Sequence, residues 1–203
     1  MMFIYTIIII GPQINQGRLP ELSSNTKITQ VFLQLVTDNI CSSNNSWGSG
    51  RKVTNYRSSD VVAWYKSTIG AARAAQNNGT LFVFSDNNNQ QVEVDTWGSL
   101  PNHAPELIDS WLTVVASDNT KAEIHYINQC GVAKAFCVST PGSTVSAAKA
   151  DSGYKLIHYS GTSMSAPHIS RIAALLMQKF PSLSTKAIAT WIKKTSSLEG
   201  LSG

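Results

Sequence analysis

Apolar and polar positions follow two different periods along the chain, and their alternation predicts helices that follow strands. Apolar residues recur at helical spacing from Ile28 to Asp38. They do so again in a helix that Ser59 would cap and that ends near Gln76, because Asn77-Asn78-Gly79 stops the pattern. The segments that suit strands are Ile40 to Asn44, Thr80 to Phe84, Trp111 to Ala116, Ala122 to Asn128 and Ala135 to Thr140.

Two more helices are predicted in the last part of the chain. The first begins at Ser163 and reaches Phe180, and it is apolar nearly all round, which predicts a helix buried within the domain. The second is amphipathic, with a cap at Ser184 or Thr185. The whole alternation predicts an α/β fold with a mostly parallel sheet flanked by helices. We assign residues 25–203 to one such domain.

The segment 1–24 stays outside this assignment. Residues 1–10 are apolar except for Thr6, and the run ahead of Gly11-Pro12 suits either a buried strand or sequence brought in by an unnatural start site. No Lys or Arg precedes the run and no Ala-x-Ala pattern follows it, so a signal peptide fits poorly. The run is also shorter than the roughly 20 residues that cross a bilayer. We therefore expect no membrane insertion by this segment.

Composition narrows the choice of partners. Charged residues make up only 14% of the chain, and Ser, Thr and Asn are abundant, a balance that favours a secreted or cell-surface protein. The net charge is +4, but the basic residues are scattered, with adjacent pairs only at Arg51-Lys52 and Lys193-Lys194. Nucleic acid is therefore not an expected partner.

The chain has three cysteines, which carry different expectations. Cys130 and Cys137 bracket a short segment that could close as a small disulfide loop in an oxidising compartment. Neither belongs to a Cys-x-x-Cys pair, so we expect no metal at them. Cys41 lies in an apolar segment and is expected to be a buried free thiol.

The strongest chemical signal is Gly161-Thr162-Ser163-Met164-Ser165-Ala166-Pro167-His168, at the junction between an extended segment and a helix. A serine in this place lies at the positive end of the helix dipole, where developing negative charge is stabilised. Pro167 suits the first turn, whose N–H groups have no partner within the helix. The block resembles the nucleophile motif of the subtilisin-like serine proteases, the subtilases. An α/β-hydrolase elbow would require Gly-x-Ser-x-Gly, which this sequence does not have; an ordinary helix-capping serine is the remaining alternative.

Three further blocks resemble subtilases, in the order of that family. Asn44-Asn45-Ser46-Trp47-Gly48 looks like the strand that pairs with the substrate backbone, which implies a substrate-binding role for Ser46, Trp47 and Gly48. Leu81 to Asn89 resembles the strand and turn of the oxyanion hole, with Asn88 as the donor. The segment from Leu107 to Cys137 looks most like the subtilase passenger domains of autotransporters.

Two of these roles have structural alternatives. The family pattern expects glycine where Asn87 stands, and three consecutive asparagines also suit any polar turn. Trp47 could equally belong to the hydrophobic core.

The catalytic base is the missing part of this resemblance. Subtilases carry their aspartate and histidine in Asp-Ser/Thr-Gly and His-Gly-x-His blocks ahead of the substrate strand, and neither occurs there in this chain. All four histidines lie further along, at His103, His125, His158 and His168. His168 is five residues beyond Ser163, about 140° around the helix, so it should point away from it. We attribute the late Asp151-Ser152-Gly153 to coincidence.

The resemblance thus implies a serine endopeptidase that acts on polypeptides without an organic cofactor, with a fold that lacks the N-terminal part bearing the Asp and His. Many members of the family bind calcium, but this chain has no EF-hand-like loop and we assign no metal ligand. Without a base the serine is a poor nucleophile, so this chain alone should be nearly inert unless an upstream segment or chain supplies both residues. The alternatives are a degenerate, peptide-binding pseudoprotease that keeps the Ser46 to Gly48 edge and a decayed reading frame with no stable product. The family implies a secreted or cell-surface location.

Overall fold

A parallel β-sheet organises the computed structural model, which describes residues 7–10, 25–118, 127–148 and 156–196. The sheet has five strands in the order β1-β2-β3-β4-β5, and each neighbouring pair is parallel. Its strands are β1 (Ile7–Ile10), β2 (Ser42–Ser46), β3 (Leu81–Ser85), β4 (Trp111–Ser117) and β5 (Cys137–Pro141). The helices are α1 (Asn25–Thr37), α2 (Ser58–Trp64), α3 (Lys66–Asn77), α4 (Thr162–Lys179) and α5 (Thr185–Thr195). The predicted α/β class is confirmed.

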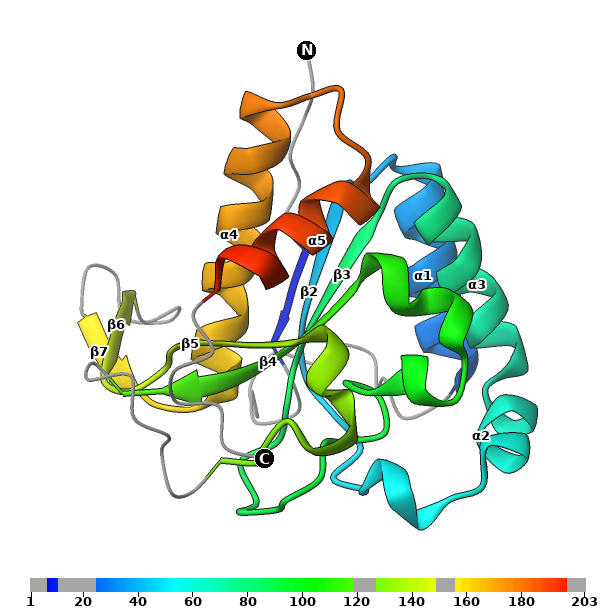
Figure 1. The fold of residues 1–203 in the computed structure, drawn as a ribbon, viewed down its shortest axis with the longest axis horizontal. Coiled ribbons are helices and arrows are strands. Elements are labelled where there is room, and N and C mark those ends of the chain that lie inside the picture. The colour runs from blue at the N-terminus through cyan, green and yellow to red at the C-terminus, as the bar shows by residue number, and fades with distance from the viewer. Residues whose placement is uncertain (1–6, 11–24, 119–126, 149–155, 197–203) are drawn as a thin grey trace.

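Helices cover both faces of this sheet (Figure 1). On one face, Phe82, Phe84 and Trp111 pack in a cluster with residues of α1 and α3. On the other, Leu81, Val83 and Val114 pack with residues of α4 and α5. Successive side chains of β3 therefore enter opposite cores, which explains why this strand is a continuous apolar run.

The helix predicted from Ser59 to Gln76 is divided in the structure. Tyr65 has φ −107° and ψ 17°, outside helical values, and separates α2 from α3. Its ring packs on Trp97, with the centroids 4.5 Å apart. This contact comes from a distant part of the chain, so the local periodicity could not show it.

The prediction that the helix after Ser163 is buried all round was wrong. Its inner face packs against the sheet through Ile169 and Ala173, but Ile172 is 42% exposed and Leu175 is 54% exposed. The helix thus has an apolar outer face as well as an apolar inner face. None of the helices that the structure describes has the length and apolar character to cross a bilayer.

The β5 region also differs from its prediction. Residues 131–136 form a 3-10 helix, so β5 begins at Cys137 rather than Ala135. The predicted strand from Ala122 to Asn128 lies mostly outside the described residues. An antiparallel hairpin that the sequence did not predict, β6 (Val145–Ala148) with β7 (Leu156–Tyr159), precedes the Ser163 turn.

Candidate active site

Ser163 lies in the first turn of α4, where the chain arrives from β7. The preceding Gly161 has φ 142°, a conformation that L side chains rarely adopt, and its N–H donates to Gly142 O at 2.7 Å. The Met164 N–H donates to Gly161 O at 3.0 Å. The Ser163 N–H has no acceptor among the described residues and lies at the positive end of the helix dipole.

The Asn88 side chain lies against this turn. Its Oδ1 accepts a hydrogen bond from the Thr162 N–H at 3.0 Å. A Cβ placed on Gly161 would be 3.1 Å from the same oxygen and 3.3 Å from Nδ2 of Asn88. The Thr162 hydroxyl also donates to the main-chain oxygen of Asp86, in a short contact. Two hydrogen bonds therefore join the start of α4 to the turn after β3.

A buried polar network joins α4 to β2. The Ser46 hydroxyl donates to Ser163 O at 3.1 Å and accepts from Asn44 Nδ2 at 3.1 Å. The Ser170 hydroxyl lies 3.1 Å from Asn44 Oδ1 and 3.3 Å from Ala166 O. Because α4 is contacted at both its first and its third turn, β2 fixes the direction in which the helix leaves Ser163.

Trp47 and Gly48, the other two predicted substrate-binding residues, take no part in this network. Trp47 is buried, with its ring against Phe84 and Trp97 at centroid distances of 5.3 and 5.4 Å, so its side chain belongs to the core. A Cβ on Gly48 would lie 2.9 Å from Oδ1 of Asn87. This approach leaves no room for a side chain at position 48 unless its neighbours move.

The described histidines make their hydrogen bonds away from Ser163. The Nδ1 of His103 lies 2.9 Å from Ser58 Oγ, and burial lowers the pKa of this imidazole. The Nδ1 of His158 lies 3.0 Å from Ser146 Oγ on the β6–β7 hairpin. His168 is exposed on α4. His125 and the Asp151-Ser152-Gly153 block fall outside the described residues.

Two buried carboxyl groups that the sequence analysis missed lie beneath the Asn88 turn. Asp86 is 2% exposed and Asp95 is 1% exposed. Burial raises the pKa of Asp86 to about 7, although the N–H groups of Asp95 and Asn87 both donate to its Oδ1. Neither aspartate belongs to a motif, and only the folded chain brings them together.

The cysteines and acidic groups of the described residues form no metal site. Cys130 and Cys137 are joined by a disulfide with an S–S distance of 2.00 Å. Cys41 is a free, half-buried thiol whose pKa is raised by burial. Across residues 7–10, 25–118, 127–148 and 156–196, no three His, Cys, Asp or Glu side chains gather in a geometry that could hold a metal ion.

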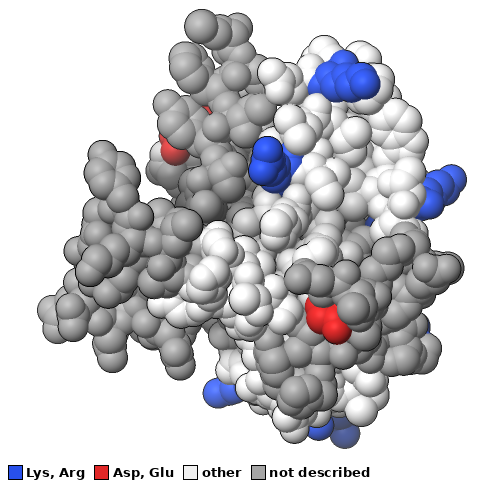
Figure 2. All heavy atoms as spheres, turned by 90° about the vertical axis from the view of Figure 1, so that its left-hand side faces the viewer, with Lys and Arg blue, Asp and Glu red and all other residues white. Residues whose placement is uncertain are grey.

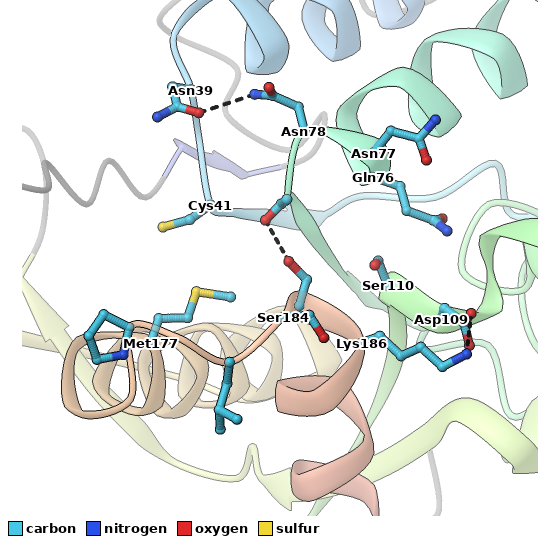
Figure 3. Close-up of a pocket in the computed structure, with 14 residues that line it drawn as sticks. Asn39, Cys41, Gln76, Asn77, Asn78, Asp109, Ser110, Met177, Ser184 and Lys186 are labelled. Atoms are coloured by element: carbon cyan, nitrogen blue, oxygen red, sulfur yellow. Dashed lines mark hydrogen bonds and ion pairs between the residues drawn. The ribbon is translucent and has the colours of Figure 1, made fainter.

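A cavity of about 520 Å³ lies at the opposite edge of the sheet (Figure 3). Cys41, Gly79 and Ser110, which line it, precede β2, β3 and β4, whereas Ser46 and Asn88 are at or beyond the carboxyl ends of their strands. Its wall includes the pair of Lys186 Nζ with Asp109 Oδ2 at 2.8 Å. This cavity is therefore separate from the Ser163 turn.

Figure 2 shows the side of the molecule that bears α4, where the described residues include few charged side chains. Its Lys and Arg side chains stand apart rather than gathering in a patch.

A parallel sheet covered by helices, with polar groups at its carboxyl edge and a serine at the start of α4, defines an α/β protein of the subtilisin-like class. The chain belongs to the Subtilase family, whose sequence profile matches residues 4–202. The resemblance first indicated by four short motifs is thus confirmed.

Individual relatives agree with this assignment. The chain is 32% identical to an extracellular serine protease of Serratia marcescens over 159 residues, which are 68% of this chain and 15% of that protein. It is 29% identical to the autotransporter lipoprotein NalP of Neisseria meningitidis over 134 residues, 59% of this chain and 12% of that protein. A solved cold adapted subtilisin-like serine proteinase shares the fold with a TM-score of 0.64 at 18% identity, over 88% of this chain and 57% of that one. The chain spans less than a fifth of these two curated relatives.

Proposed function

We propose that this chain carries the nucleophile part of a serine endopeptidase site that cleaves polypeptides. Ser163 is the nucleophile, and its own N–H and Asn88 Nδ2 stabilise the oxyanion. The backbone of Ser46 to Gly48 binds the substrate as an added strand. The observation that carries this proposal is the hydrogen bond from the Thr162 N–H to Asn88 Oδ1, because it holds the Asn88 amide at the turn where Ser163 begins its helix.

The base is proposed to come from outside the 203 residues. A serine hydroxyl attacks a carbonyl only when a base takes its proton, and the described histidines that are hydrogen-bonded have other partners. A separate segment or chain that bears the Asp-Ser/Thr-Gly and His-Gly-x-His blocks would complete the site. The extracellular and autotransporter relatives support a secreted or cell-surface location.

Labelling with a fluorophosphonate tests this proposal. We expect the chain alone to label as slowly as Ser163→Ala. When it is combined with an Asp- and His-bearing subtilase segment, we expect an adduct on Ser163 that Ser163→Ala abolishes. Equal labelling of the combined wild type and Ser163→Ala would overturn the proposal.

A second candidate function is a peptide-binding pseudoprotease. The favouring observation is that Asn44 and Ser46 of β2 keep their hydrogen bonds to α4, whereas His103 and His158 are hydrogen-bonded to Ser58 and Ser146 rather than to Ser163. In that case a peptide would bind the chain with the same affinity in wild type and Ser163→Ala, and the combined protein would not label.

A further inference from the structure

The carboxyl group of Asp95 is buried and is held by hydrogen-bond donors. Its oxygens accept from the Ser49 N–H at 3.0 and 3.1 Å, from Ser49 Oγ at 2.8 Å and from the Arg51 N–H at 3.2 Å. They also accept from Asn87 Nδ2 and from the Trp97 N–H, both at 2.9 Å. Burial of a polar group costs free energy unless its atoms are hydrogen-bonded, so these donors stabilise the carboxyl group in its place.

These donors come from the two segments that flank the candidate site. Ser49 and Arg51 follow directly on the strand end Ser46 to Gly48, and Asn87 is the residue before Asn88. The packing is close as well as hydrogen-bonded, because a Cβ on Gly48 would be 3.0 Å from Asp95 Oδ1 and 2.9 Å from Asn87 Oδ1. One carboxylate thus fixes the spacing between the substrate strand and the Asn88 turn.

We propose that Asp95 is a positioning residue, which sets the distance between the substrate-binding strand end and the oxyanion donor Asn88. This inference rests on the proposed function. Its effect passes through Asn87 to Asn88, and from the Asn88 amide to the Thr162 N–H. The arrangement suits catalysis because an oxyanion donor has to be held within about 0.5 Å of its productive place.

Amide hydrogen exchange of the whole 203-residue chain tests the positioning without requiring activity. In Asp95→Asn one acceptor oxygen becomes an N–H donor, so we expect exchange at Thr162 and Asn87 to quicken by about 10-fold or more. Asp109→Asn, a half-exposed carboxylate beside Lys186 at the far edge of the sheet, is the matched control and should leave both amides unchanged. Loss of protection confined to Ser49, Arg51 and Trp97 would show a local anchor and overturn the inference.

A second variant, Asn87→Ala, tests the inference independently of whether Asp95→Asn folds. Asn87→Ala removes the side-chain donor that joins the Asp95 carboxyl group to the Asn88 turn, and leaves the bonds from Ser49 and Trp97 in place. We expect faster exchange at Thr162 with unchanged exchange at Ser49. Unchanged exchange at Thr162 would overturn the inference.

Labelling kinetics of the chain combined with the Asp- and His-bearing segment distinguish an effect on positioning from a general loss of folded protein. Two labelling rates are measured, one with a peptidyl phosphonate and one with a small fluorophosphonate. We expect Asp95→Asn to lower the ratio of the first rate to the second by about 10-fold or more, because only the peptide probe contacts both the substrate strand end and the Asn88 turn. An unchanged ratio would contradict the inference. If the combined wild type does not label, the proposed function fails, and the amide exchange alone decides whether Asp95 acts as inferred.

Discussion

At the scale of single residues, the chemistry of this chain depends on two kinds of position. Ser163 and Asn88 were found in the sequence because they stand in recognisable blocks. Asp86 and Asp95 stand in no such block, and their importance comes from burial that only the fold produces. A short sequence motif therefore predicts the reacting groups, whereas the groups that hold them depend on contacts between distant segments.

The Asp86 carboxyl should make stability fall as pH rises. Its pKa is about 7 in the folded protein, whereas that of an unfolded Asp is near 3.9, so the folded state holds more protons between these values. The stability contributed by protonated Asp86 is complete below about pH 4 and is lost as pH rises through about 7. We expect this group to lower the free energy of unfolding by up to about 4 kcal/mol between about pH 4 and pH 8.

Urea denaturation of wild type and Asp86→Asn at several pH values measures this effect. Asp86→Asn keeps an oxygen for the N–H groups of Asn87 and Asp95 but does not titrate, so the fall between about pH 5 and pH 8 should largely disappear. Asp109→Asn should retain it. The assignment is wrong if wild type and Asp86→Asn keep parallel pH dependences.

Gly161 is required at its position both for its backbone angle and for space. Its φ is 142°, and a Cβ would lie 3.1 Å from Asn88 Oδ1. We expect Gly161→Ala to lower the free energy of unfolding by about 1–3 kcal/mol. Gly70→Ala is the control, since Gly70 lies within α3 with nothing within 4 Å of an added Cβ, and it should stabilise by about 0.5–1 kcal/mol. Equal effects of the two substitutions in chemical denaturation would exclude strain at Gly161.

At the scale of elements, apolar periodicity predicted most of the sheet and the helices that cover it. It placed β3 and β4 well because both are buried apolar runs. It did not predict the break at Tyr65 or the β6–β7 hairpin, because a distant ring contact sets the first and antiparallel pairing between two four-residue strands sets the second.

The polar strand β2 shows a limit of such patterns. All five of its residues are Ser or Asn, and all are buried. Most of its side chains find partners on α4 or on one another, whereas Ser42 Oγ and Asn45 Oδ1 have none among the described residues. The amino-acid sequence alone does not reveal these partners.

The network between β2 and α4 gives a prediction about coupling. Asn44→Ala leaves the Ser46 and Ser170 hydroxyls without their buried partner, so we expect a loss of about 1–3 kcal/mol in the free energy of unfolding. A double-mutant cycle with Ser170→Ala should give a coupling energy of at least about 0.5 kcal/mol. Thr37→Ala, an exposed change on α1, should stay within about 0.5 kcal/mol. Additive effects of Asn44→Ala and Ser170→Ala would contradict the network.

At the scale of the whole molecule, membership of the Subtilase family does not decide whether this chain alone has a catalytic base for Ser163. The profile match over residues 4–202 and the shared fold establish a subtilase. The isolated activity of these 203 residues remains a prediction, because it depends on a base that the described residues do not offer to Ser163. The site is accordingly proposed to be completed by another segment.

The most direct test of the central claim is the rate at which a fluorophosphonate modifies Ser163 in the combined protein when Asn88 is replaced. Loss of one oxyanion donor costs about 10² to 10³ in turnover, a value measured in a subtilisin. We predict that Asn88→Ala slows the modification by about this factor, while Asn89→Ala, the same change one residue later in the exposed turn, stays within about 3-fold of wild type. Equal rates for Asn88→Ala and Asn89→Ala would contradict the account.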